Sequence, residues 1–163
     1  MKKINLLIST FFGYGYLTKI PGTVTSLVTA VFIYIAYEYL GYTDLKFSII
    51  FFSLLFFYSF YAVKDAESQF KNKDPRQIVI DEVLGQAMPL ILVLYLSQNN
   101  QLSLQIEIYY VLSFIFFRFF DILKPFPVSY FDKNFKNYFG IIMDDIMAGI
   151  YSMILIYLIS LKF

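Results

Sequence analysis

The sequence contains neither cysteine nor histidine. Without cysteine it can form no disulfide, thiolate nucleophile or lipoprotein anchor. Without histidine it lacks the usual general base and the commonest nitrogen ligand for zinc. Lipid phosphatases that use paired histidines or a reactive cysteine are therefore excluded. Any chemistry must use carboxylates, lysine, arginine, hydroxyl groups or the backbone.

Charge is also scarce in this chain. Only 15% of the 163 residues are charged, whereas 59% are hydrophobic and 21% are aromatic. A soluble domain has about 25% charged residues, so the composition predicts a single membrane-embedded domain over residues 1–163. The formal net charge of +1 provides no field that would recruit nucleic acid, and we expect no nucleic-acid partner. The oligomeric state is left open.

Five apolar stretches predict an all-α, polytopic membrane helix bundle of about five spans, at 24–40, 47–63, 83–97, 106–123 and 146–161. Each is slightly shorter than the roughly 20 residues that cross a bilayer comfortably. A further stretch, 4–12, is too short to cross. Lys2 and Lys3 precede it, but no small-residue cleavage site follows, so we expect a short interfacial or re-entrant segment rather than a cleaved signal peptide.

The basic residues are distributed unequally across the five predicted spans. All of the 13 lysines and arginines except Lys46 and Lys162 fall on the side of the N-terminus and of loops 64–82 and 124–145. Because basic loops stay in the cytoplasm, this bias places the N-terminus and loops 64–82 and 124–145 in the cytoplasm. Most acidic residues fall on the same side: Asp65, Asp74, Asp81, Glu82, Asp121, Asp132, Asp144 and Asp145.

The segment GYGYLTKIPGTVTS, residues 13–26, combines glycines with Lys19, Thr23 and Ser26 just before the first predicted span. Glycine lets backbone N–H groups approach an anion, and the start of a helix adds a partial positive charge. The segment is thus a candidate phosphate-binding loop. An ordinary loop in which Thr23 or Ser26 is a helix N-cap is the alternative.

Two acid pairs share one layout. Asp81 and Glu82 precede the third span and Asp144 and Asp145 the fifth, and each pair is followed by a glycine four residues after one member, at 85 and 149. Glycine would let the two helices pack closely and bring the pairs together. One acid would suffice to favour a helix dipole, whereas four carboxylates need a cation. Since only oxygen ligands are available, we expect Mg²⁺, with Mn²⁺ possible, bound by Asp81, Glu82, Asp144 and Asp145.

The segment FRFFDILKPFP, residues 117–127, spaces Arg118, Asp121 and Lys124 by three, which places them on one helix face before the prolines end the helix. A charged triplet at this depth is costly unless it is used. An ion-paired stripe with snorkelling side chains is the alternative. With Lys19, these cations indicate an anionic, phosphate-like substrate.

Four motifs, YLTKIPGTVTSL, DPRQIVIDEVLGQ, FRFFDILKPFPV and GIIMDDIMAG, together resemble the phosphatidylglycerophosphatase A family in order and spacing. Thr25 replaces a family glycine, and Asn137 and Tyr138 stand where relatives tend to have paired glycines. The resemblance implies an all-helical, Mg²⁺-dependent lipid phosphatase that converts phosphatidylglycerophosphate to phosphatidylglycerol at the bacterial inner membrane. It also implies a set of site residues: Asp81, Glu82, Asp121, Asp144 and Asp145 as catalytic, and Thr23, Ser26, Arg118 and Lys124 as substrate-binding. Lys19 joins the substrate-binding set because of its charge and not through the resemblance.

Other functions are weighed against this expectation. A phosphatidyltransferase requires an Asp-Gly pair, and the chain contains none. A small ion-coupled transporter would place its acids within the spans as a cation path, whereas these lie at span ends. A purely structural protein leaves the four charged motifs unexplained. Within the phosphatase hypothesis, either water or an aspartate could be the nucleophile.

Overall fold

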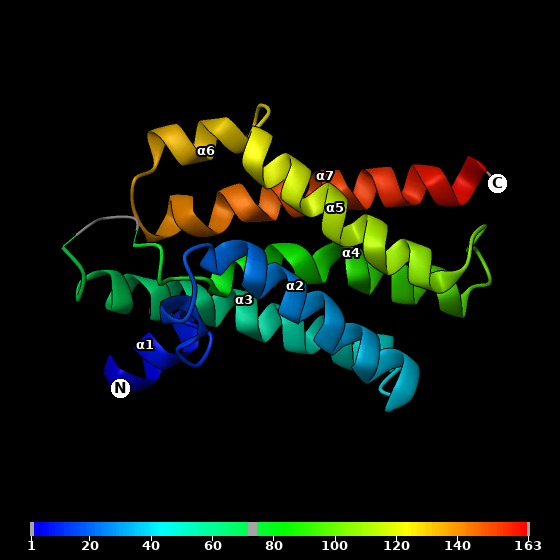
Figure 1. Ribbon diagram of the computed structural model, residues 1–163, viewed down its shortest axis with the longest axis horizontal. Coiled ribbons are helices and arrows are strands. Elements are labelled where there is room, and N and C mark those ends of the chain that lie inside the picture. The colour runs from blue at the N-terminus through cyan, green and yellow to red at the C-terminus, as the bar shows by residue number, and fades with distance from the viewer. Residues whose placement is uncertain (1, 72–74, 163) are drawn as a thin grey trace.

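The computed structural model describes residues 2–71 and 75–162, and within them it contains helices and no β-strand (Figure 1). The predicted all-α class is therefore confirmed. Lys73 and Asp74, which the charge distribution places on the cytoplasmic side, lie outside the described residues. The elements follow one another as α1 (Lys2–Ser9), η1 (Tyr14–Tyr16), α2 (Pro21–Tyr34), η2 (Ile35–Tyr39), α3 (Leu45–Glu67), α4 (Ile80–Gln98), α5 (Ile106–Leu123), α6 (Val128–Asn134) and α7 (Tyr138–Lys162).

Three described helices are long and apolar enough to cross a membrane: Leu45–Glu67, Ile80–Gln98 and Tyr138–Leu161. The other two predicted spans correspond to shorter or more charged elements. The α-helical part of α2 has 14 residues and continues as the π-helical turn η2, while α5 carries Glu107, Arg118 and Asp121 within 18 residues. The three apolar helices support the prediction of a membrane protein, but they do not confirm the predicted count of five spans.

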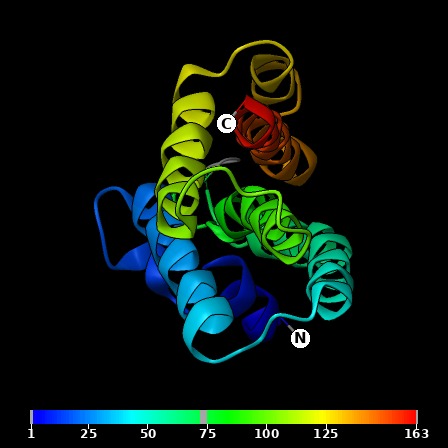
Figure 2. The same ribbon diagram turned by 90° about the vertical axis from the view of Figure 1, so that its right-hand side faces the viewer.

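The long helices run side by side along the longest axis of the molecule, with α4 packed against α2, α3, α5 and α7 (Figures 1 and 2). Helix α3 lies at the outside, and only 17% of its apolar window is buried, compared with 56% for α4. Its exposed side chains include Phe47, Phe51 and Phe57. Such a face is suited to lipid tails rather than water.

Helices α4 and α7 approach each other at two glycines. A Cβ atom at Gly149 would lie 2.6 Å from the backbone oxygen of Gly85, and one at Gly85 would lie 2.7 Å from the backbone oxygen of Asp145. Side chains at either position would force the backbones apart. The close packing predicted from the two glycines is confirmed, and it fixes where Asp145 sits relative to the start of α4.

Helix α1 is a short helix docked on α3. The Asn5 amide donates to Asp65 Oδ2 over 2.8 Å, and the Tyr58 hydroxyl donates to Asn5 Oδ1 over 2.7 Å, so the buried Asn5 side chain joins the two helices. On its other face Ile4 and Leu7 are exposed. With eight residues, α1 is too short to cross a bilayer, and its interfacial position stays a prediction.

Candidate active site

A polar cavity of about 310 Å³ lies at the end of the bundle where α2, α4 and α7 begin and α5 ends. These helix ends form its walls, and α6, which packs against α7, contributes Asp132 to them. The residues that line it are Ile20, Pro21, Gly22, Thr23, Arg76, Ile78, Val79, Asp81, Glu82, Arg118, Asp121, Lys124, Asp132, Phe135, Lys136, Gly140, Ile141, Asp144 and Asp145.

The cavity gathers most of the residues that the sequence indicated. All five candidate acids line it, together with Thr23, Arg118 and Lys124. Ser26 lies behind the wall, where its hydroxyl contacts Glu82. Lys19 is exposed and does not belong to the cavity wall. The four segments, which are separated along the chain, therefore meet in one cavity. Of the predicted site residues, Lys19 lies outside it.

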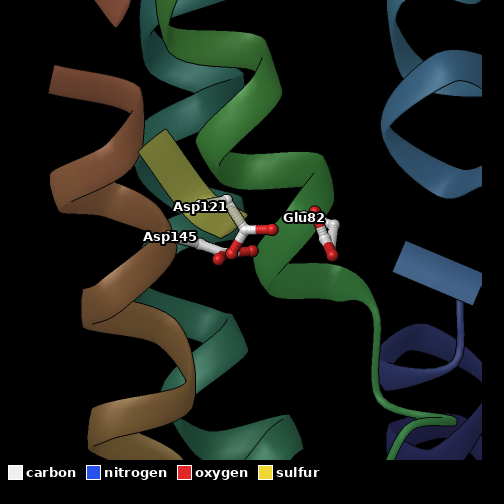
Figure 3. Close-up of side chains that lie close together, drawn as sticks. All are labelled: Glu82, Asp121 and Asp145. Carbon is white, nitrogen blue, oxygen red and sulfur yellow. The ribbon is translucent and has the colours of Figure 1, made fainter. Parts of the chain in front are cut away.

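Three carboxylates from three helices form the centre of this cavity. Glu82 on α4, Asp121 on α5 and Asp145 on α7 each place an oxygen within 4.8 Å of the others, and Figure 3 shows the three groups pointing toward a common space. They are largely withdrawn from solvent, with side chains 12% exposed for Glu82 and 13% for Asp121. Three negative groups this close repel one another strongly unless a cation lies among them.

Arg118 partly neutralises the three-carboxylate centre. Its Nη1 atom lies 2.5 Å from Glu82 Oε2, 3.0 Å from Asp121 Oδ2 and 3.3 Å from the Ser26 hydroxyl. The pairing of Arg118 with Asp121 is the i,i+3 contact expected from their spacing on one helix face. One guanidinium thus joins α5 to α4 and α2, and its ion pairs are with Glu82 and Asp121 rather than Asp145.

A second ionic group lies beside the first. Lys124, the C-cap residue that follows α5, extends its amine to 2.6 Å from Asp144 Oδ2 and 2.9 Å from Asp132 Oδ1 on α6. Burial alone would lower the pKa of Lys124, but the carboxylates of Asp144 and Asp132 raise it above its ordinary value. Burial would raise the pKa of Asp132, but Lys124 and Lys136 lower it. Lys124 and Asp132 therefore stay ionised.

The pair Asp144–Asp145 is divided between the two groups. Asp145 belongs to the central carboxylates, whereas Asp144 contacts Lys124. Both residues lie inside α7 and not at its start, because the helix begins at Tyr138. The Asn137 side chain accepts from the N–H groups of Phe139 and Gly140 and so begins the helix earlier than the apolar stretch suggested.

The start of α2 forms the opposite wall of the cavity. Its N-cap residue is Ile20 and Pro21 is the first helical residue, so the alternative that Thr23 or Ser26 is the N-cap is wrong. The Ser26 hydroxyl instead lies 2.8 Å from Glu82 Oε2. A Cβ atom at Gly22 would collide with Glu82 Oε1. Gly22 therefore lets a carboxylate of α4 reach the first turn of α2.

Sequence reasoning missed three charged residues of the cavity wall. Asp132, Lys136 and Arg76 all line it, and the first two form an ion pair of 3.7 Å. The spacing of four between Asp132 and Lys136 was a weak signal, because Lys136 lies beyond the end of α6 at Asn134. Nothing in the sequence indicated that this helix, α6, would fold over the acidic centre.

Comparison with known proteins identifies the family. A family model described as phosphatidylglycerophosphatase A matches residues 7–160. The chain belongs to the phosphatidylglycerophosphatase A family. It is 35% identical to "Phosphatidylglycerophosphatase A" of Haemophilus influenzae, an alignment that covers 98% of this chain and 94% of that protein. It is 28% identical to the Escherichia coli protein of the same name, over 94% of this chain and 82% of that one.

A third relative carries a different description. The "Putative phosphatidylinositol-3-phosphatase" of Bacteroides thetaiotaomicron is 36% identical, over 93% of this chain and 90% of that protein. No solved structure matches the chain. As a member of the phosphatidylglycerophosphatase A family, the chain is a phosphatase, and the cavity with its carboxylates and cations is the candidate site for that activity.

Proposed function

We propose that this phosphatase removes the terminal phosphate of phosphatidylglycerophosphate, releasing phosphatidylglycerol and inorganic phosphate at the cytoplasmic face of the bacterial inner membrane. The single observation that carries the proposal is the convergence of Glu82, Asp121 and Asp145 with Arg118 and Lys124 in one cavity of a chain that belongs to this family. Carboxylates and cations side by side suit a metal ion together with a phosphate.

The donor set fits Mg²⁺. All available ligands are oxygens, which Mg²⁺ prefers. Asp145 is 4% exposed, and its Oδ2 atom has no hydrogen-bond partner among the described residues, although it lies in the charged centre. A cation would satisfy that atom. We propose Glu82, Asp121 and Asp145 as the core of the metal site, with Asp81 and Asp144 at its edge.

The remaining residues form a cradle for phosphate. Arg118 and Lys124 supply positive charge on one side of the cavity, and the first turn of α2 supplies backbone N–H groups on the other. Thr23 adds a hydroxyl group on that same turn. Lys19 is exposed outside this wall, so we propose that it contacts the membrane or the lipid backbone rather than the reacting phosphate.

The proposed chemistry is hydrolysis of a phosphomonoester. When bound, Mg²⁺ would withdraw charge from phosphate oxygen and make water a better nucleophile. Arg118 and Lys124 offset the negative charge that grows on the phosphate in the transition state. Asp121 holds Arg118 in place over 3.0 Å. A route through an aspartyl-phosphate is the variant, and a trapped phosphoenzyme would establish it in place of direct attack by water.

The identity of the lipid headgroup is a separate part of the proposal. Two relatives are named for phosphatidylglycerophosphate and one for phosphatidylinositol 3-phosphate. Both substrates present a phosphomonoester on a lipid headgroup, so the cradle alone fits either. We favour phosphatidylglycerophosphate because the family model carries that name. Parallel assays on both lipids distinguish the two.

The ion-coupled transporter is the less favoured function. Its acids would lie midway along the spans, whereas Glu82 lies in the first turn of α4 and Asp121 in the last turn of α5. The carboxylates therefore face the end of the bundle and not its middle. Such an arrangement suits a lipid headgroup held at the membrane surface.

The decisive experiment is phosphate release by the purified full-length protein in detergent, with phosphatidylglycerophosphate, with and without Mg²⁺. We expect activity that disappears with a chelator and returns with Mg²⁺. Glu82→Gln and Asp145→Asn should each lose at least about 100-fold in kcat. Glu107→Gln, at the far end of α5, is the matched control and should stay active. Full activity of both site variants would contradict the metal assignment.

A further inference from the structure

The side chain of Gln86 is unusual for its place in the bundle. It is completely buried on α4, and neither its amide oxygen nor its amide nitrogen has a hydrogen-bond partner among the described residues. A buried amide without partners is costly in the interior of a membrane protein. A leucine at this position would bury no unpaired polar group and would destabilise the bundle less. The amide at this position therefore suggests a functional role.

Helical register places Gln86 directly behind the active site. It follows Glu82 by four residues, so both project from the same face of α4, and Gln86 lies one turn farther from the cavity. Glu82 on that face contacts Ser26 of α2 and Arg118 of α5. Gln86 therefore lies in the seam between α2, α4 and α5.

Two further polar groups on this seam also need partners. On α2, Thr29 follows Ser26 by three residues, and because α2 and α4 both lead away from the cavity, it lies at about the depth of Gln86. The Thr29 hydroxyl and Arg118 Nε are buried without a hydrogen-bond partner among the described residues. Farther along the seam the packing is apolar, with Ala30, Leu90 and Val93.

We propose that Gln86 is a positioning residue of the phosphatase, which holds the Arg118–Glu82 pair from the membrane side. Its amide oxygen offers the acceptor that Arg118 Nε needs, and its amide nitrogen offers a donor to the Thr29 hydroxyl, with a buried water as the bridge. A guanidinium fixed at Nε as well as at Nη1 keeps one orientation toward the phosphate. The inference rests on the proposed roles of Glu82 and Arg118.

Gln86→Leu separates this role from a merely structural one, because the two predict different combinations of stability and rate. Leucine fills the same buried volume and leaves Arg118 Nε and the Thr29 hydroxyl to the bridging water, so the melting temperature in detergent should change little. If Gln86 positions Arg118, kcat should nevertheless fall at least tenfold, with KM changed less than threefold. Thr29→Val should lower kcat in the same direction but less, since it removes one partner of the amide.

The matched control is Ser152→Ala, which removes another completely buried polar group, on α7, away from the seam. It should keep kcat. Full kcat in Gln86→Leu, with an equal or higher melting temperature, would overturn the inference. Glu82→Gln is assayed alongside: if it also keeps full activity, the proposed site itself fails, whereas its inactivation beside an active Gln86→Leu would refute only the role of Gln86. A lower melting temperature for Gln86→Leu together with a kcat that falls no more than in Ser152→Ala would mean that the amide serves packing, and this also counts against the inference.

Discussion

Arg118 connects the helices of the active site through a single nitrogen atom. Its Nη1 reaches Glu82 on α4, Asp121 on α5 and the Ser26 hydroxyl on α2. Lysine carries the same charge but is a flexible point charge without a planar fork of donors. We expect Arg118→Lys to fold and to lose about 100-fold in kcat/KM, the usual scale for one lost donor to a developing charge. Steady-state kinetics with Mg²⁺ measures the loss, and Lys46→Arg, at the exposed start of α3 and away from the cavity, serves as the control.

Gly22 is the residue that admits Glu82 to the first turn of α2. Alanine usually stabilises a helix relative to glycine, but a Cβ here would meet Glu82 Oε1, the far end of a flexible side chain. We therefore expect Gly22→Ala to keep its melting temperature while the displaced Glu82 costs at least tenfold in kcat. Leu27→Ala, on the exposed face of α2, is the control. Unchanged kcat in Gly22→Ala would show that Glu82 needs no such room.

For single residues, the sequence predicted well which residues gather at the cavity but not how they contact one another. Glu82 and Asp145 stood out because carboxylates beside long apolar runs are costly without a use. Their grouping with Asp121, rather than with Asp144, depends on the rotation of three helices about their axes. Two neighbouring helical residues point about 100° apart, so Asp144 meets Lys124 while Asp145 meets the centre. Periodicity within one helix carries no information about such contacts between helices.

Among the helices, the crossing of α4 and α7 determines the geometry of the site. Gly149→Ala would place a Cβ 2.6 Å from the backbone oxygen of Gly85, which cannot move as a side chain does. Overpacking of this kind costs about 1–3 kcal/mol, so we expect a lower melting temperature. We also expect lower phosphatase activity, because Asp145 moves away from Glu82. Ile154→Ala, on the exposed side of α7, should change neither by a comparable amount.

Helix existence was easier to predict than helix boundaries. Every predicted span corresponds to a helix, since long apolar runs in a membrane satisfy their backbone groups in no simpler way. The start of α7 was misplaced because an apolar run marks the part of a helix that suits lipid, whereas the helix itself starts at the Asn137 side chain. Helix α6 was missed because seven residues with mixed polarity leave no clear period.

For the whole molecule, the bundle determines which loops share an end. In Figure 1 the cavity end contains the loops after α3 and around α6, and the opposite end contains the connections η2–α3 and α4–α5. Three helical units have comparable lengths. Helix α2 has 14 residues and continues into the five residues of η2, α4 has 19 residues, and α5 has 18. We propose on this basis that α2 with η2 and α5 cross the membrane as well as α3, α4 and α7, although α2 is shorter and α5 carries three charged residues.

The chain contains no cysteine, so single cysteines can report its topology without a background. With five spans and a cytoplasmic site, Thr43→Cys and Gln101→Cys should react with an impermeant thiol reagent in intact cells, and Lys71→Cys and Lys133→Cys only after permeabilisation. With α3, α4 and α7 as the sole spans, positions 101 and 133 would lie on one side and 71 on the other, because α5 would not cross between them. Labelling of 71 and 133 from outside would place the acidic cavity away from the cytoplasm and would contradict the orientation inferred from lysine and arginine.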